Sequence, residues 1–221
     1  MNKVLNIIVE GPTEREFVTQ CMKPYFEDRN IFNVRPIGIE TKPGYKGGDV
    51  RYEVRFKPHI ERTLRGKEDM IVTSLIDFYK LRADFPKYSE AQKIVDKAQQ
   101  VAFLEQACAD DIDDSRFVPY IQLHEFEALL FTKWAGFADF AIPEANKRAI
   151  QKIIAEFPNP ELINDRPQFA PSERLKNLII PKYEKPFHGN YIALENGFDA
   201  ILEKCPRFKQ WVDTLVARMT A

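Results

Sequence analysis

An apolar run at residues 4–9 ends on Glu10 and is followed at once by a Gly-Pro pair. A short run rich in β-branched and aliphatic residues predicts a strand buried on both faces, as in a parallel sheet. A helix is expected directly afterwards, because Thr13 can act as its N-cap and Glu16, three residues later, can complete a capping box. The succession of strand, tight turn and helix predicts an α/β fold.

Glu10 then lies at the carboxyl end of the first strand, and Glu14 lies in the first turn of the helix. In open α/β sheets, ligands bind outside the carboxyl ends of the strands. The two carboxylates flank one turn and can share a cation, so a metal site is expected here. The helix dipole also favours Glu14, by about 0.3–1 kcal/mol, without any function. An unpaired Glu10 in a sheet crevice is harder to explain that way, since it must find a partner or become neutral.

Two further predicted strands also end on acids. Residues 70–76 lead into Asp77, and residues 117–123 lead towards Glu125 and Glu127. Because the carboxyl ends of parallel strands meet at one edge, these acids should converge with the first-strand glutamate. Asp77 can alternatively cap the following turn. The two glutamates face different sides of a helix, so which of them points inward stays open.

Other segments give the outline of the fold. A strand at 32–41 is expected to lie at a sheet edge or to contain a bulge, because Pro36 cannot donate a ladder hydrogen bond. A long helix is predicted from Ser89 to Cys108, with Ser89 as its cap. The acidic cluster at 110–114 lacks the spacing of a calcium loop and is interpreted as solvated.

Candidate phosphate-binding residues occur in a glycine-rich segment, 42–49. Gly47 and Gly48 allow backbone N–H groups to approach an anion, while Lys42 and Lys46 supply positive charge. An ordinary surface loop explains the same composition. The segment lacks the ending of a P-loop, so nucleotide hydrolysis is not expected.

Basic residues on a helix predicted over 51–65 form either a solvated face or a nucleic-acid contact. In the last third of the chain, a helix expected to be capped by Ser172 precedes a basic, aromatic loop. Such a loop suits a phosphate backbone and a stacked base, or a partner protein, or plain surface. The candidate residues here are Arg174, Lys176, Lys182, Lys185 and His188.

The chain of 221 residues, 44% of them hydrophobic, can bury one sizeable core. We expect an α/β domain at 1–132 and a proline-rich helical appendage at 133–221. The formal net charge of −1 gives no global sign of nucleic-acid binding. Cys21, Cys108 and Cys205 lack metal-site spacing and predict buried thiols. Neither a signal segment nor an apolar run of about 18 residues is present, which favours a soluble cytoplasmic protein.

The motif IVEGPTE after a buried strand resembles the opening of TOPRIM domains, in which a glutamate ends the first strand and aspartates end the third. It is most similar to the variant in OLD-type nucleases, where a second acid follows four residues later. With the downstream segments HEFEALLF, PSERLKNLI and PKYEKPFHG, nearly the whole chain is similar to a bacterial TOPRIM-like family of unknown function. The resemblance implies a Rossmann-like, mostly parallel sheet flanked by helices.

The activity implied by this resemblance is metal-dependent hydrolysis of a phosphodiester, with Mg²⁺ or Mn²⁺ as cofactor because the candidate ligands are hard oxygens. Glu10 and Asp77 would hold the principal ion. A second ion or a general base would be supplied by one of Glu14, Glu125 and Glu127. Lys46 or Lys80 would stabilise the charge of the transition state. Tyr79 replaces the second aspartate of the TOPRIM pattern, which leaves a one-metal or degenerate site open.

Members of this family are often encoded beside an ABC-type ATPase in phage-defence pairs. The resemblance therefore implies a nuclease effector controlled by that ATPase, acting on DNA, RNA or tRNA, and able to form homo-oligomers. The main alternative is a catalytically inactive regulatory or interaction subunit of the ATPase. A third is a phosphate sensor that uses the glycine-rich segment.

Overall fold

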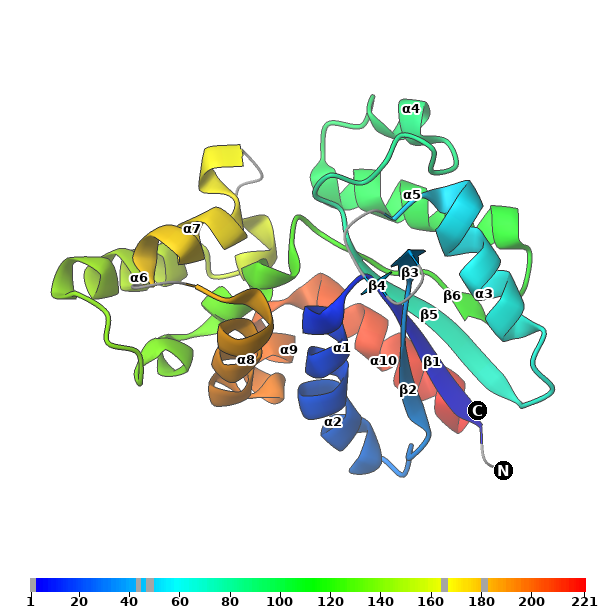
Figure 1. Cartoon of the computed structure of the whole chain (residues 1–221), viewed down its shortest axis with the longest axis horizontal. Coiled ribbons are helices and arrows are strands. Elements are labelled where there is room, and N and C mark those ends of the chain that lie inside the picture. Colours follow the sequence, from blue (N-terminus) through cyan, green and yellow to red (C-terminus); the bar gives the residue numbers. More distant parts are fainter. Residues whose placement is uncertain (1–2, 43–44, 47–49, 164–166, 180–182) are drawn as a thin grey trace.

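A five-stranded sheet lies at the centre of the computed structural model, which describes residues 3–42, 45–46, 50–163, 167–179 and 183–221. The strands follow the order β2-β1-β5-β6, and β7 also pairs with β5. Every pairing in this sheet is parallel. The predicted α/β fold is therefore confirmed, and the strands end at one common edge (Figure 1). Their bounds are β1 Val4–Val9, β2 Val34–Gly38, β5 Met70–Asp77, β6 Phe117–Val118 and β7 Ile121–Gln122.

Strand β1 is central, and all six of its residues are buried. Alternate side chains enter the two hydrophobic clusters that cover the sheet: Leu5, Ile7 and Val9 belong to one, and Val4 and Ile8 to the other. This two-sided burial explains why β1 reads as a nearly continuous apolar run.

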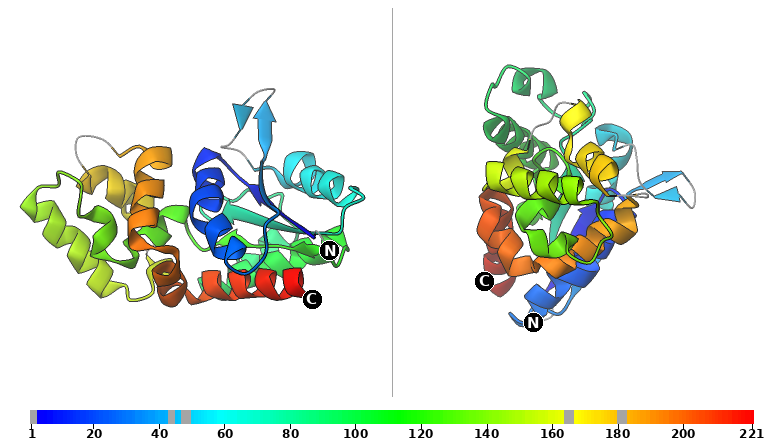
Figure 2. Two further views of the ribbon diagram at one scale, coloured as in Figure 1. Left: turned by 90° about the horizontal axis from the view of Figure 1, so that it is seen from below. Right: turned by 90° about the vertical axis from the view of Figure 1, so that its left-hand side faces the viewer.

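Strand β2 is an edge strand, as its proline predicts. Beyond it, β3 (Glu40–Lys42) and β4 (Tyr45–Lys46) pair as an antiparallel hairpin. The hairpin projects from the body of the molecule, as the left view of Figure 2 shows.

Helices cover both faces of the sheet. One face carries α1 (Pro12–Phe17), α2 (Lys23–Glu27) and α10 (Pro206–Thr220), with a π-helical turn joining the first two. The other face carries α3 (Lys57–Leu64) and α5 (Lys97–Ile112), and the short α4 (Tyr88–Ala91) precedes α5. The predicted single helix over 89–108 is wrong, because Asp96 caps α5 by accepting a hydrogen bond from Gln99 N–H at 2.8 Å.

Residues 126–204, the helical lobe, extend to one side of the sheet (Figure 1). Within its described residues the lobe contains helices and no strand. It begins with the 3₁₀ segment η3 (Phe126–Thr132), and its cluster of apolar side chains continues into that of the sheet. Its α-helices are α6 Glu144–Glu156, α7 Pro171–Leu178, α8 Asn190–Asn196 and α9 Phe198–Lys204.

Two predicted helix caps are wrong. Helix α1 starts after Gly11, and Glu14, not Glu16, accepts the Gly11 N–H at 3.0 Å. Pro12 suits the first helical position because it lacks an N–H group to satisfy. Helix α7 likewise begins at Pro171 with Ala170 before it, which frees Ser172 for the contact described below.

The predicted solvated acidic cluster is wrong in part. Asp111 accepts a hydrogen bond from the Tyr52 hydroxyl at 2.9 Å and pairs with Lys57 at 2.8 Å. Asp114 pairs with Arg116 at 2.7 Å. These contacts tie the end of α5 and the next segment to the rest of the domain.

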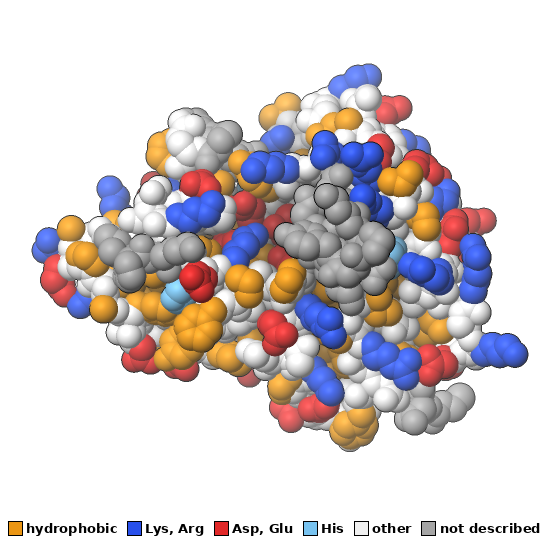
Figure 3. Space-filling view, in the orientation of Figure 1, with side chains coloured by type: hydrophobic (Ala, Val, Ile, Leu, Met, Phe, Trp, Pro, Cys, Tyr) orange, Lys and Arg blue, Asp and Glu red, His pale blue; other side chains and the backbone are white. Residues whose placement is uncertain are grey.

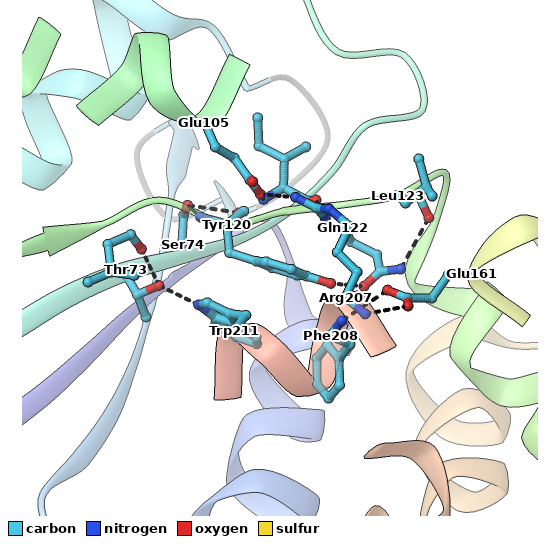
Figure 4. A network of polar contacts seen from close by, with 12 residues as sticks. Thr73, Ser74, Glu105, Tyr120, Gln122, Leu123, Glu161, Arg207, Phe208 and Trp211 are labelled. Carbon is cyan, nitrogen blue, oxygen red and sulfur yellow. Dashed lines mark hydrogen bonds and ion pairs between the residues drawn. The ribbon is translucent and has the colours of Figure 1, made fainter. Parts of the chain in front are cut away.

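Helix α10 is attached to the sheet by a buried polar network, shown in Figure 4. Glu161 from the helical lobe accepts hydrogen bonds from the backbone N–H groups of Arg207 and Phe208, at 2.9 and 3.1 Å. It thereby caps a helix far from it in sequence. At the next turns, the Trp211 indole N–H donates to the Thr73 hydroxyl at 2.8 Å, and the Trp211 ring stacks on Tyr120.

All three cysteines are buried free thiols, as predicted. Across the described ranges, no helix combines the length and apolarity that crossing a membrane would need.

Candidate functional site

Acidic side chains converge at the carboxyl edge of the sheet. Glu10 follows β1, Asp77 ends β5 and Glu125 follows β7, and all three line one cavity of about 450 Å³. Three cationic residues, Lys80, Arg82 and Lys185, line the same cavity. Figure 3 shows red and blue side chains together in a hollow on this face. The parallel register of the sheet brings together acids that are 48 and more positions apart in the sequence.

Asp77 is held between the sheet and the helical lobe. Its Oδ1 accepts a hydrogen bond from Phe126 N–H at 2.9 Å, and its Oδ2 lies 4.0 Å from Lys185 Nζ. Burial raises the pKa of Asp77 well above its usual value; Lys185 lowers it, while Glu14, Glu10 and Glu125 raise it. Burial is therefore the main reason for the raised pKa of Asp77, and Lys185 is the charge that opposes it most.

Glu14 is buried in the first turn of α1. Its Oε2 accepts the Gly11 N–H, so the turn between β1 and α1 and the position of this carboxylate depend on each other. Its charge raises the pKa values of both Asp77 and Lys185. Glu14 therefore acts electrostatically on the cavity although it does not line it.

Glu125 is fixed by one residue of the helical lobe. Its Oε2 accepts the Ser172 backbone N–H at 2.9 Å, and its Oε1 accepts the Ser172 hydroxyl at 3.0 Å. A second cavity of about 280 Å³ adjoins the first and is lined by Glu125, Ser172, Lys176, Tyr183 and others. Burial and the charges of Glu125 and Glu14 raise the pKa of Tyr183, so its phenol is neutral.

Glu127 has no solvent-exposed surface, and neither of its oxygens accepts a hydrogen bond within the described residues. Its counter-charge is Lys185, whose Nζ lies 3.0 Å from Glu127 Oε1. Burial would lower the pKa of Lys185, but the charges of Asp77, Glu14, Glu125 and Glu10 outweigh it and raise the pKa. Lys185 is thus a protonated ammonium group among carboxylates, with Glu127 beneath it.

Two non-glycine residues with left-handed backbone flank the cavity. Lys80 has a φ of 63° and His124 a φ of 67°, and the Tyr79 N–H donates to the His124 carbonyl at 2.7 Å. Such conformations cost about 1 kcal/mol or more each and often occur at functional sites. The hydrogen bond between Tyr79 and His124 therefore joins the segments that follow β5 and β7 at the rim of the cavity.

A divalent cation suits this site in donor type and in charge. Every acidic group here is a carboxylate, the ligand that Mg²⁺ and Mn²⁺ prefer, and three of these acids line the cavity. The acids are not assembled as a ready ligand cage, however. In the described part of the chain, no three acidic, histidine or cysteine side chains are grouped closely enough to hold an ion.

The model of a domain of unknown function, DUF4276, matches residues 9–216. The chain belongs to this family. The match covers every acid of the cavity, the helical lobe, and the sheet from the end of β1 onward. No curated protein matches the chain, and no solved structure does.

The predicted phosphate-binding residues fall into three groups: those that line a cavity, those that line neither cavity, and those outside the described part of the chain. Lys185 lines both cavities, as does Lys80, and Lys176 lines the second. Arg174 and His188 line neither of the two: Arg174 donates to the Phe169 carbonyl, and His188 Nδ1 accepts the Glu184 N–H. The side chains of Lys42 and Lys46, together with Gly47, Gly48 and Lys182, lie outside the described part.

Two residues of the site were not predicted: Arg82 and Ser172. Arg82 comes five positions after Asp77, so proximity to a strand-end acid is a signal that could have identified it. Ser172 was predicted only as a helix cap. Tyr183, the aromatic residue of the predicted basic loop, lines the second cavity. Tyr79, the residue in place of a second aspartate, lines the cavity itself.

Proposed function

We propose that the protein is a metal-dependent phosphodiesterase that acts on nucleic acid, a nuclease of the TOPRIM type. The observation that carries the proposal is the cavity in which Glu10, Asp77 and Glu125 meet Lys80, Arg82 and Lys185. Carboxylates can hold a cation and cationic side chains can hold a phosphate, and a phosphodiesterase needs both in one place.

Glu10 and Asp77 are the proposed ligands of the principal ion, because both follow central strands and line the cavity. When bound, Mg²⁺ or Mn²⁺ would polarise the scissile phosphate as a Lewis acid. Glu14 adds negative charge behind these two residues, which favours cation binding.

Glu125 is the proposed general base. The two hydrogen bonds from Ser172 fix its carboxylate, and a base must be held within reach of the proton that it accepts. Glu127 is the proposed positioning residue for Lys185, which it holds by an ion pair at 3.0 Å. Lys185, Lys80 and Arg82 then supply positive charge to the phosphate oxygens.

The TOPRIM assignment and the partner rest on sequence resemblance. We propose on that basis an ABC-type ATPase as controlling partner and phage defence as the setting. Tyr79 in place of the second aspartate favours a single principal ion, since one oxygen ligand is missing from that position.

The test is Mn²⁺ binding by calorimetry together with cleavage of labelled single-stranded DNA, double-stranded DNA and RNA, with and without EDTA. We expect saturable binding and EDTA-sensitive cleavage, both lost in folded Glu10→Gln and Asp77→Asn proteins. Glu203→Gln is the matched control, because Glu203 is exposed on α9 in the helical lobe. Absence of Mn²⁺ binding by the native chain at millimolar metal would refute the proposal.

A second candidate function is supported by one observation. Lys185 already provides a positive charge between Asp77 and Glu127, and a catalytically inactive interaction subunit could keep its acids together in this way. In that case the native chain binds no Mn²⁺, and Lys185→Met destabilises it without any rescue by metal.

A further inference from the structure

A basic cavity lies beside the edge strand, apart from the acidic site. It has a volume of about 340 Å³ and is lined by Arg15 from α1, by His59, Arg62 and Thr63 from α3, and by residues 36–38 of β2. The described residues that line it include no carboxylate. The cavity therefore presents positive charge and hydrogen-bond donors without a built-in anion.

Among the residues that the structure describes, the two arginines have no acidic partner. Two neighbouring cations do have an acidic partner: Lys57, the first residue of α3, pairs with Asp111, and Arg65, directly after α3, pairs with Glu61. Arg15 and Arg62, by contrast, form no side-chain hydrogen bond or ion pair within the described ranges, and both are exposed. Two unpaired guanidinium groups that face one cavity from different helices are a suitable pair for an anion.

A phosphate group is the anion that this geometry favours. Guanidinium forks match phosphate oxygens in a bidentate manner. The Thr63 hydroxyl already donates to the His59 carbonyl at 2.8 Å, so the two arginines are the groups that hold the anion. A protein strand added to this edge is less suitable, because Pro36 lacks the N–H group that a new ladder would use.

The elements that carry the cavity are neighbours of those that carry the acidic site. Gly38 in its wall is the register partner of Val9, and Ile39 N–H donates to the Val9 carbonyl at 3.0 Å. Val9 directly precedes Glu10, and Arg15 directly follows Glu14. A polymer that carries several phosphates is the ligand suited to contact both sites.

We propose that the cavity of Arg15 and Arg62 binds a non-reacting phosphate of a polynucleotide whose scissile phosphate lies at the acidic site. This inference rests on the proposed function and narrows it to nucleic-acid strands, as opposed to small phosphate esters. Arg15 and Arg62 are then binding residues that take no part in the chemical step.

The test separates strand binding from chemistry. Binding of a fluorescein-labelled single-stranded oligonucleotide is measured by anisotropy in EDTA over a series of salt concentrations. Hydrolysis of bis(p-nitrophenyl) phosphate, a diester too small to span both sites, is measured with Mn²⁺. The proteins are wild type, Arg15→Gln/Arg62→Gln, the charge-preserving Arg15→Lys/Arg62→Lys, and the control Arg148→Gln, an exposed arginine on α6.

We expect the glutamine variant to bind the oligonucleotide roughly tenfold more weakly for each arginine removed, with a salt slope lower by about 1 to 2. The lysine variant should keep the slope, and hydrolysis of the small diester should be unchanged in all four proteins. Equal oligonucleotide binding by the glutamine variant and the Arg148→Gln control would overturn the inference, even if the small diester is cleaved. Loss of oligonucleotide binding in a protein that cleaves no diester would instead support the phosphate site and count against the nuclease.

Discussion

Replacement of Lys185 by methionine should destabilise the protein strongly at neutral pH. The substitution keeps much of the aliphatic stem but removes the charge that faces Glu127 and Asp77. Glu127 has no exposed surface and would be left as a buried carboxylate without a counter-charge. Such a group costs far more than a lost surface ion pair, because neither water nor a cation compensates it.

The distances give the scale of the effect. At an effective dielectric constant of about 20, a charge pair at 3.0 Å contributes about 5.5 kcal/mol and one at 4.0 Å about 4 kcal/mol. The Lys185 side chain is 40% exposed, so water screens part of this. We therefore expect a net loss of about 3 kcal/mol, the lower end of the range for breaking a buried ion pair. For a chain of this size the melting temperature should fall by roughly 6–12 °C.

Thermal unfolding followed by circular dichroism in EDTA at pH 7 measures this loss. The double variant Lys185→Met/Glu127→Gln should recover at least half of it, since the buried charge is then gone as well. Lys176→Met is the matched control, because its partner Glu173 is exposed and the pair contributes under about 1 kcal/mol. A Lys185→Met loss no larger than that of Lys176→Met, or a double variant no more stable than the single one, would refute the reasoning.

Three further changes test neighbouring contacts. Asp77→Asn should stabilise the protein in metal-free buffer at pH 7–8, with a free energy of unfolding higher by about 0.5–2 kcal/mol. The folded-state pKa of Asp77 lies above the unfolded one, so the native state binds the extra proton and wild-type stability is lost as pH rises through that window. Ser172→Ala should cost about 1–2 kcal/mol, because Glu125 Oε1 loses its hydroxyl donor while the backbone N–H still serves Oε2. Glu161→Ala should cost about 2–3 kcal/mol, because two buried N–H groups at the start of α10 lose their acceptor.

Each of these is checked by denaturant or thermal unfolding against wild type. If the stability of Asp77→Asn depends on pH in the same way as that of wild type, the raised pKa of Asp77 is contradicted. Ser172→Ala keeps the Cβ atom, so an unchanged stability of that variant would mean that the hydroxyl contact with Glu125 contributes nothing. An unchanged melting temperature in Glu161→Ala would mean that water replaces the carboxylate at α10.

The sequence was informative where structure is local. The apolar run before Glu10 predicts a strand buried on both faces, and it is the central strand. Strand-end acids converge because parallel pairing brings carboxyl ends to one edge, so Glu10, Asp77 and one of Glu125 and Glu127 could be grouped before the structure was known. The structure places Glu125 in the cavity wall. A proline within a strand pattern likewise predicted the edge.

The contacts that could not be predicted are those between distant segments. Lys185 lies 108 positions from Asp77, and no periodicity indicates that it faces the acids. Ser172 has the side chain of a helix cap, yet Pro171 already starts the helix and the hydroxyl serves Glu125. Helix boundaries failed for a similar reason, since several residues near each start can cap and tertiary contacts choose among them.

The fold can be completed only when α10, formed by residues 206–220, packs on the sheet. Trp211 meets Thr73 across 138 positions, and Phe208 and Leu215 belong to the cluster on the same face of the sheet as Leu5 and Ile7. Contacts of such high sequence separation form slowly, because a long loop must close first. During synthesis, the part of this apolar face that α10 covers stays exposed until the residues of α10 have been made. The nascent chain should therefore be a client of chaperones that shield apolar surface, with release coupled to docking of the helix.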